Sequence, residues 1–513
     1  MIYFKLINLL SFIIVNLFAT YYLLNIFQQE HYCTKKYLGH FLNFYFKNIY
    51  LYFFYICIFL TVFQSCYHTI LILLMVIIIL IFPKKYIVKL KITRRILFLL
   101  ITYCIVSLIP FLFFNNHLII YLILSVLSPC IYILCNLINT PIEMIIRKKY
   151  INLAKQKLNN NKNLITIGIT GSYGKTSCKN IINHIVQDYY LTLSTPKSYN
   201  TLMGITSVIN NQLHPNTEIL ILEMGAFRKG EIREMTKFVP LNIAGITGIG
   251  PQHLSTFKTM SNVLSAKLEI VSSICYESSL VLNGDNQYLK NLDLIQIQDL
   301  CFVGLDDSNR YLAKNIEVKD GITEFDIYKR EKRLVHITTK LLGKHNIRNI
   351  LFAYGIIQAL NKKGLSITNS IFEEKVKSIE YIPHRLAYSK QGNINIYDDS
   401  YSSNLVGFMS AVEVLEKIKT KKVIITPGIV DCGKSSKNIN ESAAESLIKV
   451  FDEIYLIRNK NTKYYTNILE AHSAQYIICK SFKDAISIVR EKYKEEEISL
   501  LIENDLPDNF LER

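Results

Sequence analysis

The residues best suited to chemistry are a lysine and a hydroxyl placed directly after a glycine turn, Gly174-Lys175-Thr176 in the stretch GITGSYGKTS. This pattern is typical of loops that bind phosphate groups. A standard P-loop reads G-x-x-x-x-G-K-[ST], and its first glycine would fall at position 169. That position holds Ile169, and the nearest glycines are Gly168 and Gly171. The loop is therefore either a shorter phosphate loop or a chance G-K-T-S in a turn.

The elements around this loop favour the phosphate interpretation. Residues 164–169 form a short apolar run typical of a strand, and residues 178–186 begin a helical pattern. A strand, a glycine loop and a helix N-terminus together direct backbone N–H groups and the helix dipole at an anion. In such a site Lys175 reaches the terminal phosphates and Thr176 offers its hydroxyl to Mg²⁺.

Two further buried strands are expected to end at the same edge of a parallel sheet. Residues 218–226 (EILILEMGA) carry Glu223 near the carboxyl end, and residues 242–255 (NIAGITGIGPQHLS) place His253 just past the end of the apolar run. Ligands of open α/β sheets bind beyond the carboxyl ends of the strands. A carboxylate and an imidazole there are expected to hold Mg²⁺ at the phosphates, although each alone is compatible with a solvated loop.

Composition separates an apolar N-terminal part from an ordinary α/β remainder. Of the formal net charge of +17 over 513 residues, +11 falls within residues 1–150. This charge flanks long apolar runs, so it indicates membrane orientation rather than nucleic-acid binding. The eleven cysteines form no C-x-x-C pair, which predicts isolated thiols in a reducing compartment.

The apolar part predicts four to five membrane-spanning helices, because each run approaches the ~20 residues that a span requires. The candidate spans are residues 6–27, 49–63, 68–82, 96–114 and 118–138. With five spans the basic segments fall on one side of the membrane, together with everything after residue 150. The sequence thus predicts a multi-pass protein of the cell (inner) membrane with cytoplasmic catalytic domains. No Asp, Glu, Lys or Arg lies deep in a span, which favours an anchor over a transport path.

An ordered set of motifs resembles the Mur ligases, a family of ATP-dependent ligases that form amide bonds. The resemblance covers about residues 160–513 and is strongest to the branch that adds D-alanyl-D-alanine to a UDP-muramoyl-tripeptide. The segments that carry it are TGSYGKTS, LEMGA, ITGIGPQHL, AKLEI, GKHNIRNILFAYG (residues 343–355), PHRLAY (383–388) and YDDSYSSN (397–404).

The resemblance implies a role for each matching residue. ATP would contact Gly171, Ser172, Gly174, Lys175, Thr176 and Ser177, with Asn346 at adenine, Arg385 at the phosphates and Asp399 at the ribose. Mg²⁺, expected as two ions from the resemblance, would be held by Thr176, Glu223, His253 and a carbamylated Lys267. Lys175, His253 and Lys267 would serve catalysis, and the acceptor side would hold Asn200, Thr201 and Asn404.

The resemblance also implies the architecture. An α/β part is expected, with a central ATP-binding domain over residues 151–381 and a Rossmann-like domain over residues 382–513, preceded by the α-helical membrane region of residues 1–150. The helices stand where the family's UDP-binding domain would lie, which leaves open whether the acceptor is UDP-linked or lipid-linked. Loops with Asp431, Glu503 and Asp505 either bind the incoming amine or are ordinary surface loops.

The expected reaction joins the carboxylate of a peptide acceptor to an amino acid or dipeptide through an acyl phosphate. Three other interpretations stay open at this point. They are a membrane-associated poly-γ-glutamate-type ligase, an ATPase that drives transport through its own helices, and a non-catalytic scaffold of a cell-wall complex.

Overall fold

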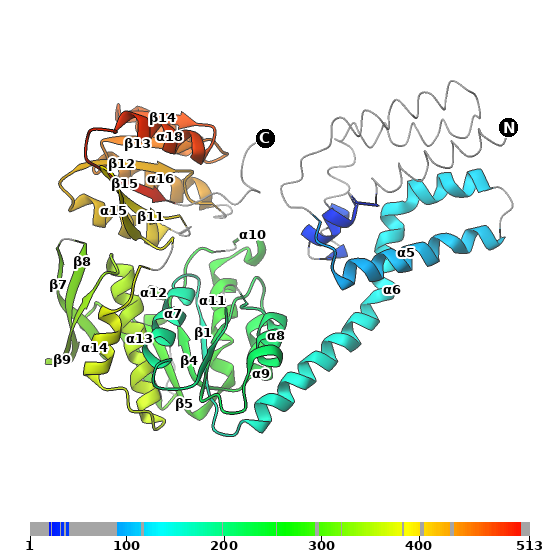
Figure 1. Cartoon of the computed structure of the whole chain (residues 1–513), viewed down its shortest axis with the longest axis horizontal. Helices are drawn as coiled ribbons and strands as arrows, with labels where there is room; N and C mark the ends of the chain where they lie inside the picture. The colour runs from blue at the N-terminus through cyan, green and yellow to red at the C-terminus, as the bar shows by residue number, and fades with distance from the viewer. Residues whose placement is uncertain are drawn as a thin grey trace. The chain divides into compact units, whose positions relative to one another are not determined.

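The computed structural model describes two compact units, Met1–Lys149 and Tyr150–Arg513. Within them it describes residues 20–21, 23–30, 32–34, 37–39, 90–113 and 117–503, with short gaps at 197–198, 253, 293–296, 320, 382–383, 401–404 and 431–434. Figure 1 draws the described residues of the first unit in blue and cyan and most of those of the second in green to red.

Two long helices begin in the first unit, α5 (Arg94–Phe113) and α6 (His117–Asn160). They run antiparallel, because Arg95 pairs with Glu143 at 2.7 Å and, further along both helices, the rings of Tyr103 and Tyr132 stack at 4.5 Å. This pairing brings Arg95 and the basic residues that follow Glu143 to the same end of the helix pair. The charge pattern of the sequence predicts this arrangement.

The described residues support only part of the predicted membrane region. Helix α5 matches the fourth predicted span, and α6 contains the fifth but continues to Asn160. Among the residues described, one helix, Leu127–Asn160, is long and apolar enough to cross a membrane. The predicted spans at 49–63 and 68–82, and most of the span at 6–27, lie outside the described residues. A region of four or five spans is therefore not supported here.

The second unit contains a nine-stranded sheet in the order β2-β3-β1-β4-β5-β6-β7-β8-β9. Strands β2 to β7 are parallel, whereas β7, β8 and β9 form an antiparallel extension that sequence analysis did not predict. The strands are β1 (Ile165–Thr170), β2 (Thr192–Ser194), β3 (Ile219–Glu223), β4 (Leu241–Ile246), β5 (Ile274–Asn283), β6 (Asp299–Gly304), β7 (Tyr311–Lys319), β8 (Ile322–Lys329) and β9 (Lys332–Thr339).

Helices cover both faces of the parallel strands, which explains why these strands read as continuous apolar runs. Alternate residues of β3 show the division: Ile221 packs into one core and Leu220 and Leu222 into the other. One core is closed by α7 (Lys175–Val186), α13 (Lys344–Lys362) and α14 (Asn369–Lys377). The other is closed by α8 (Leu202–Gln212), α9 (Glu231–Phe238) and α11 (Met260–Leu268).

A second sheet follows, with six strands in the order β10-β11-β15-β12-β13-β14. All neighbours are parallel except β10 and β11. Its strands are β10 (Ala387–Gln391), β11 (Ile394–Asp399), β12 (Lys421–Thr426), β13 (Glu453–Ile457), β14 (Tyr476–Cys479) and β15 (Ile498–Glu503). Its helices are α15 (Leu405–Glu416), α16 (Ser436–Ile448), α17 (Thr462–Ala471) and α18 (Phe482–Lys492). The predicted parallel α/β architecture is thus confirmed in both sheets of this unit.

Candidate active site

The glycine loop lies between β1 and α7, as predicted, at the carboxyl edge of the first sheet. Strand β1 ends at Thr170, and α7 begins at Lys175 rather than near residue 178. Ile169 is fully buried and pairs with Glu223 of β3 on one side and Gly245 of β4 on the other. A strand residue with a core side chain therefore occupies the position where a longer P-loop has its first glycine.

Close packing explains why residue 171 of the loop is a glycine, and backbone conformation explains the same for residue 174. A Cβ atom on Gly171 would lie 2.2 Å from the Thr247 hydroxyl oxygen, and Gly174 has a left-handed backbone with φ of 79°. Ser172 is committed to structure: its hydroxyl donates to the Gly250 carbonyl and accepts from the Gly250 N–H, both at 3.0 Å. The loop is thus fastened to the segment that follows β4.

Lys175 lies within this loop as the family resemblance implies. Its Nζ donates to the Gly171 carbonyl oxygen at 2.8 Å. Burial lowers the pKa of its ammonium to about 8, with the Arg385 charge acting in the same direction and Glu223 opposing. The Lys175 ammonium therefore lies over the glycine loop from which α7 begins.

Glu223 is the centre of a buried polar cluster. Its Oε2 accepts from the Thr176 hydroxyl at 2.9 Å, and its Oε1 accepts from the Asn200 amide at 3.1 Å. The Lys179 ammonium lies 3.7 Å from Oε2 and donates to the Thr195 carbonyl at 2.6 Å. The structure thus joins the predicted metal ligands Thr176 and Glu223 to the predicted acceptor residue Asn200.

Sequence analysis missed Lys179 in this cluster, although a signal was present. Lys179 follows Lys175 by four residues, which places both on one face of α7. Its side chain is buried. Burial lowers the pKa of its ammonium, while the neighbouring Glu223 opposes that shift.

Lys267, at the end of α11, is buried with only 2% of its surface exposed. Burial first, and then the nearby Lys175 charge, lower its pKa to about 7 against the opposing effects of Glu231 and Glu269. With a pKa of about 7, a substantial fraction of this amine is uncharged near neutral pH. Such an amine is a nucleophile rather than a fixed cation.

Other predicted ligands are placed differently or not described. His253 and Asn404 lie outside the described residues. Thr201 is exposed and caps α8, accepting from the Gly204 N–H at 3.2 Å. Within the described part of the chain, no three His, Cys, Asp or Glu side chains converge as a metal site. The oxygens of Thr176 and Glu223 still suit Mg²⁺, which prefers a few protein oxygens together with phosphate and water.

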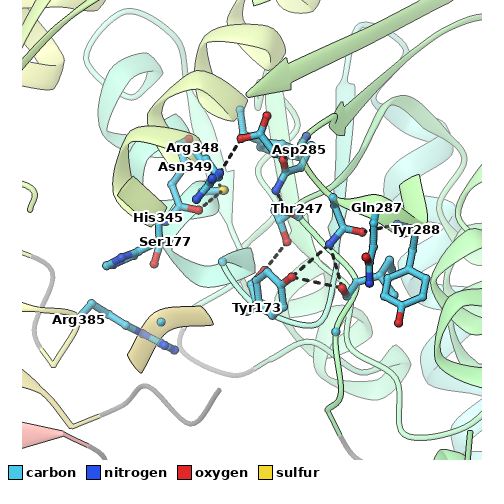
Figure 2. A pocket seen from close by; sticks show the side chains of 18 of the residues that line it. Tyr173, Ser177, Thr247, Asp285, Gln287, Tyr288, His345, Arg348, Asn349 and Arg385 are labelled. Carbon is cyan, nitrogen blue, oxygen red and sulfur yellow. Dashed lines mark hydrogen bonds and ion pairs between the residues drawn. The ribbon is translucent and has the colours of Figure 1, made fainter. Parts of the chain in front are cut away.

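Next to the glycine loop lies a pocket of about 390 Å³, shown in Figure 2. Its walls include Gly174 and Ser177 from the loop region, Arg348 and Asn349 from α13, and Asp285 after β5. Arg348 donates to Asp285 at 2.7 Å. Although burial acts to raise it, hydrogen bonds from Arg348 and from the backbone N–H groups of residues 305 and 306 hold the pKa of Asp285 below its usual range. An ordered, charged wall therefore faces this pocket.

Helix α13 lines the pocket with His345, Arg348 and Asn349, whereas the resemblance implied that Asn346 contacts the nucleotide. Asn346 is 1% exposed and donates to the Leu342 carbonyl at 2.8 Å. Asn349, three residues later, lines the pocket and donates to the Asn346 side-chain oxygen at 3.2 Å. His345 also lines it, and burial together with the Arg385 and Arg348 charges lowers its pKa to about 4. Asn346 therefore supports the pocket wall through Asn349.

Arg385 and Asp399 line the same pocket, as the resemblance implies. Arg385 stands in a strained turn, because both of its neighbours, His384 (φ 62°) and Leu386 (φ 52°), have left-handed backbones. The turn is held from β11: the Leu386 N–H donates to Asp399 at 3.0 Å, and the His384 ring bonds Asp398 at 2.8 Å. Arg385 is thus placed by two consecutive aspartates.

Comparison with known proteins identifies this arrangement. A profile of the Mur ligase middle domain matches residues 169–357. Residues 169–357 are thus a Mur ligase middle domain. The Mur ligase homologues of this chain indicate ATP-dependent peptide ligation in cell-wall precursor synthesis.

Two similar curated relatives bear the name "UDP-N-acetylmuramoyl-tripeptide--D-alanyl-D-alanine ligase". The enzyme of Buchnera aphidicola subsp. Baizongia pistaciae is 28% identical over 323 residues, which is 60% of this chain and 68% of that protein. The enzyme of Bacillus subtilis is 27% identical over 276 residues, 52% of this chain and 56% of that protein. The similarity to the Bacillus subtilis enzyme thus covers little more than half of that enzyme's length.

Solved structures share the fold. MurF from Thermotoga maritima in complex with ADP has a TM-score of 0.61 and 22% identity, covering 70% of this chain and 80% of that chain. MurF from Acinetobacter baumannii has a TM-score of 0.62 and 20% identity, covering 70% and 77%. These TM-scores show that the chain described here has the MurF-like α/β fold.

Proposed function

We propose that this protein uses ATP to join the carboxylate of a cell-wall precursor peptide to the amine of an amino acid or of D-alanyl-D-alanine. The observation that carries the proposal is the Glu223 cluster, which places Thr176, Lys179 and Asn200 around one carboxylate beside the Lys175 loop. It supports the proposal because a residue expected at the phosphates, Thr176, and a residue expected at the acceptor, Asn200, contact the same carboxylate. The names of the curated relatives support the dipeptide as the donor.

The chemistry requires opposite charges to be managed at close range. The acceptor carboxylate attacks the γ-phosphorus of ATP, ADP leaves, and an acyl phosphate forms. The incoming amine then attacks the acyl carbon, loses a proton, and inorganic phosphate departs. Because the carboxylate and the triphosphate repel each other, Lys175 and Arg385 are suited to neutralise the transferring phosphoryl group.

The residues present fit Mg²⁺ at this site. Thr176 and Glu223 would hold it, with His253 and Lys267 as the family's further ligands, and the ion would neutralise charge on the phosphates. Lys179 and Asn200 keep the Glu223 carboxylate oriented from the other side.

We also propose that Lys267 is carbamylated. Its neutral amine would attack CO₂ and release one proton, which converts the buried amine into an anion that attracts the Lys175 charge. Native mass spectrometry of the protein in bicarbonate should show the mass of one added CO₂, and Lys267→Arg should not show it. An unmodified mass in bicarbonate for the unsubstituted protein would contradict the proposal.

Attachment to the membrane through the first unit completes the proposed function, with the catalytic domains in the cytoplasm. It is supported by the apolar helix Leu127–Asn160 and by exposed apolar side chains along α5, including Ile101, Ile105 and Leu108. A lipid-linked acceptor would suit such a location. Cell fractionation tests it: the chain should remain in the membrane pellet after a high-salt wash, and full recovery in the supernatant would rule the attachment out.

The ligase proposal is tested by acceptor-dependent turnover. The full chain with ATP and D-alanyl-D-alanine should release phosphate only when a muramoyl-tripeptide is added, in its UDP-linked or its lipid-linked form. Assaying the two forms side by side identifies the acceptor, and replacing the dipeptide by glutamate tests a poly-γ-glutamate-type reaction. Phosphate release without any acceptor would indicate an ATPase, and no release with any substrate would indicate a scaffold.

A further inference from the structure

Two buried carboxyl groups face each other across neighbouring strands at the edge of the second sheet. Asp399 ends β11 and Glu503 ends β15, and the parallel register pairs these two residues directly. Each is only 1% exposed. Asp399 lines the nucleotide pocket, whereas Glu503 is not among the residues described as lining it.

Hydrogen-bond accounting distinguishes the two groups. Asp399 Oδ1 accepts from the Leu386 N–H at 3.0 Å. No N–H or O–H group of another described residue donates to either oxygen of Glu503. The parallel register places the side chains of Glu503 and Asp399 on the same face of neighbouring strands, where the two carboxyl groups interact. Two neighbouring carboxyl groups can share a hydrogen bond only when one of them carries a proton, because an ionised carboxylate has no donor.

We propose that Glu503 is a positioning residue that stays protonated in the native enzyme and donates its carboxyl proton to Asp399, fixing that carboxylate in the nucleotide pocket. This inference rests on the proposed function only for the identity of the ligand. The protonation of Glu503 is expected in the protein without any bound ligand.

The surroundings assign the proton to Glu503. The Leu386 N–H stabilises the charged form of Asp399 alone, and Asp399 borders an open pocket. Burial first, and then the Asp399 charge, raise the pKa of Glu503 well above its usual range. The Arg385 charge opposes this shift of the Glu503 pKa without removing it. The remaining titratable groups of the turn, His384 and Asp398, bond each other.

This role differs from both sequence-based interpretations, in which Glu503 lies in a loop that either binds the incoming amine or is an ordinary surface loop. Glu503 is the last residue of a buried strand, and its partner is the carboxylate that the family resemblance assigns to the ribose. Asp399 also holds the turn that presents Arg385. A fixed Asp399 therefore serves both the ligand contact and the placement of Arg385.

The direction in which pH changes the folding stability follows from the raised pKa of Glu503. The pKa of Glu503 is higher in the folded than in the unfolded chain, so its stabilising contribution is complete below the ordinary glutamate range. It is lost progressively as the pH rises from that range through the raised folded value. Each pH unit in this window should reduce the folding equilibrium constant by about tenfold on account of this group.

The test compares Glu503→Gln, which mimics the protonated carboxyl, with the matched control Glu497→Gln, an exposed glutamate next to the same strand that pairs with Lys390. Infrared spectra of the full chain should show a protonated-carboxyl band at neutral pH that shifts on ¹³C-glutamate labelling. The band should disappear in Glu503→Gln and persist in Glu497→Gln. Glu503→Gln should also lose the tenfold-per-unit pH dependence of unfolding and retain ADP affinity within about threefold.

Several results would overturn the inference. A labelled protein without a protonated-glutamate band at neutral pH would do so even if the variant failed to fold. A pH dependence of unfolding that is the same in Glu503→Gln and the unsubstituted chain would do so as well. Because the band and the unfolding curve need no turnover, an inactive enzyme with the band would reject the ligase proposal and keep this one.

Discussion

Replacing Lys175 by methionine is expected to lower kcat/KM by about 10²–10³-fold, the loss seen when one preorganised donor to a developing charge is removed. Methionine keeps the length and the apolar contacts of the side chain but cannot donate a hydrogen bond or neutralise a phosphate. The stability of the fold should change little, because the Lys175 ammonium is partly desolvated and its pKa is already lowered to about 8. Steady-state kinetics with thermal unfolding of the same preparations measures both effects.

Lys237→Met provides the matched control, because Lys237 is an exposed lysine on α9 of the same domain. It should keep full activity. A Lys175→Met variant with turnover within a few fold of the unsubstituted enzyme would show that the loop cation does not act on the transferring phosphoryl group.

Replacing Glu223 by glutamine is expected to remove turnover and also to destabilise the fold by about 3–5 kcal/mol. Removing one partner of a buried ion pair leaves the other charge uncompensated, and that desolvated charge accounts for most of the cost. Here the remaining charge is Lys179, whose side chain is 3% exposed and lies 3.7 Å from the carboxylate. Chemical denaturation of the variant measures the stability, and phosphate release measures the activity.

The pair Glu223 and Lys179 allows the two effects to be separated. Lys179→Met alone should also be destabilising, but the double variant Glu223→Gln with Lys179→Met should lose much less than the sum, since no buried charge remains unpaired. Activity should stay absent in the double variant, because the carboxylate is still missing. Additive stability losses would mean that the two groups do not interact, and recovered activity would exclude Glu223 from the chemistry.

The sequence predicted the parts of the site that lie within one strand–loop–helix segment. Short continuous apolar runs and the glycine pattern placed β1, the glycine loop and Glu223 correctly, because local propensity and burial agree there. The start of α7 was misplaced by three residues, since the serine and threonine after Lys175 are weak helix formers that the first turn tolerates. The antiparallel strands β7 to β9 were missed because their alternating polar residues resemble surface loops.

The pocket beside the loop was harder to predict because its walls are joined across long stretches of chain. The pair of Asp285 and Arg348 spans 63 residues, and neither residue belongs to a motif whose spacing reveals the other. The resemblance directed attention to Asn346, whereas the turn of α13 directs Asn349 into the pocket. Only three-dimensional packing decides which of two asparagines on one helix faces a ligand.

The strained turn around Arg385 has a consequence for motion. Left-handed backbone costs a non-glycine residue about 1–2 kcal/mol, so His384 and Leu386 keep theirs only while Asp398 and Asp399 hold them. If either contact opens, the turn gains by relaxing, and Arg385 moves with it. The position of the Arg385 guanidinium therefore depends on two aspartate contacts made outside its own side chain.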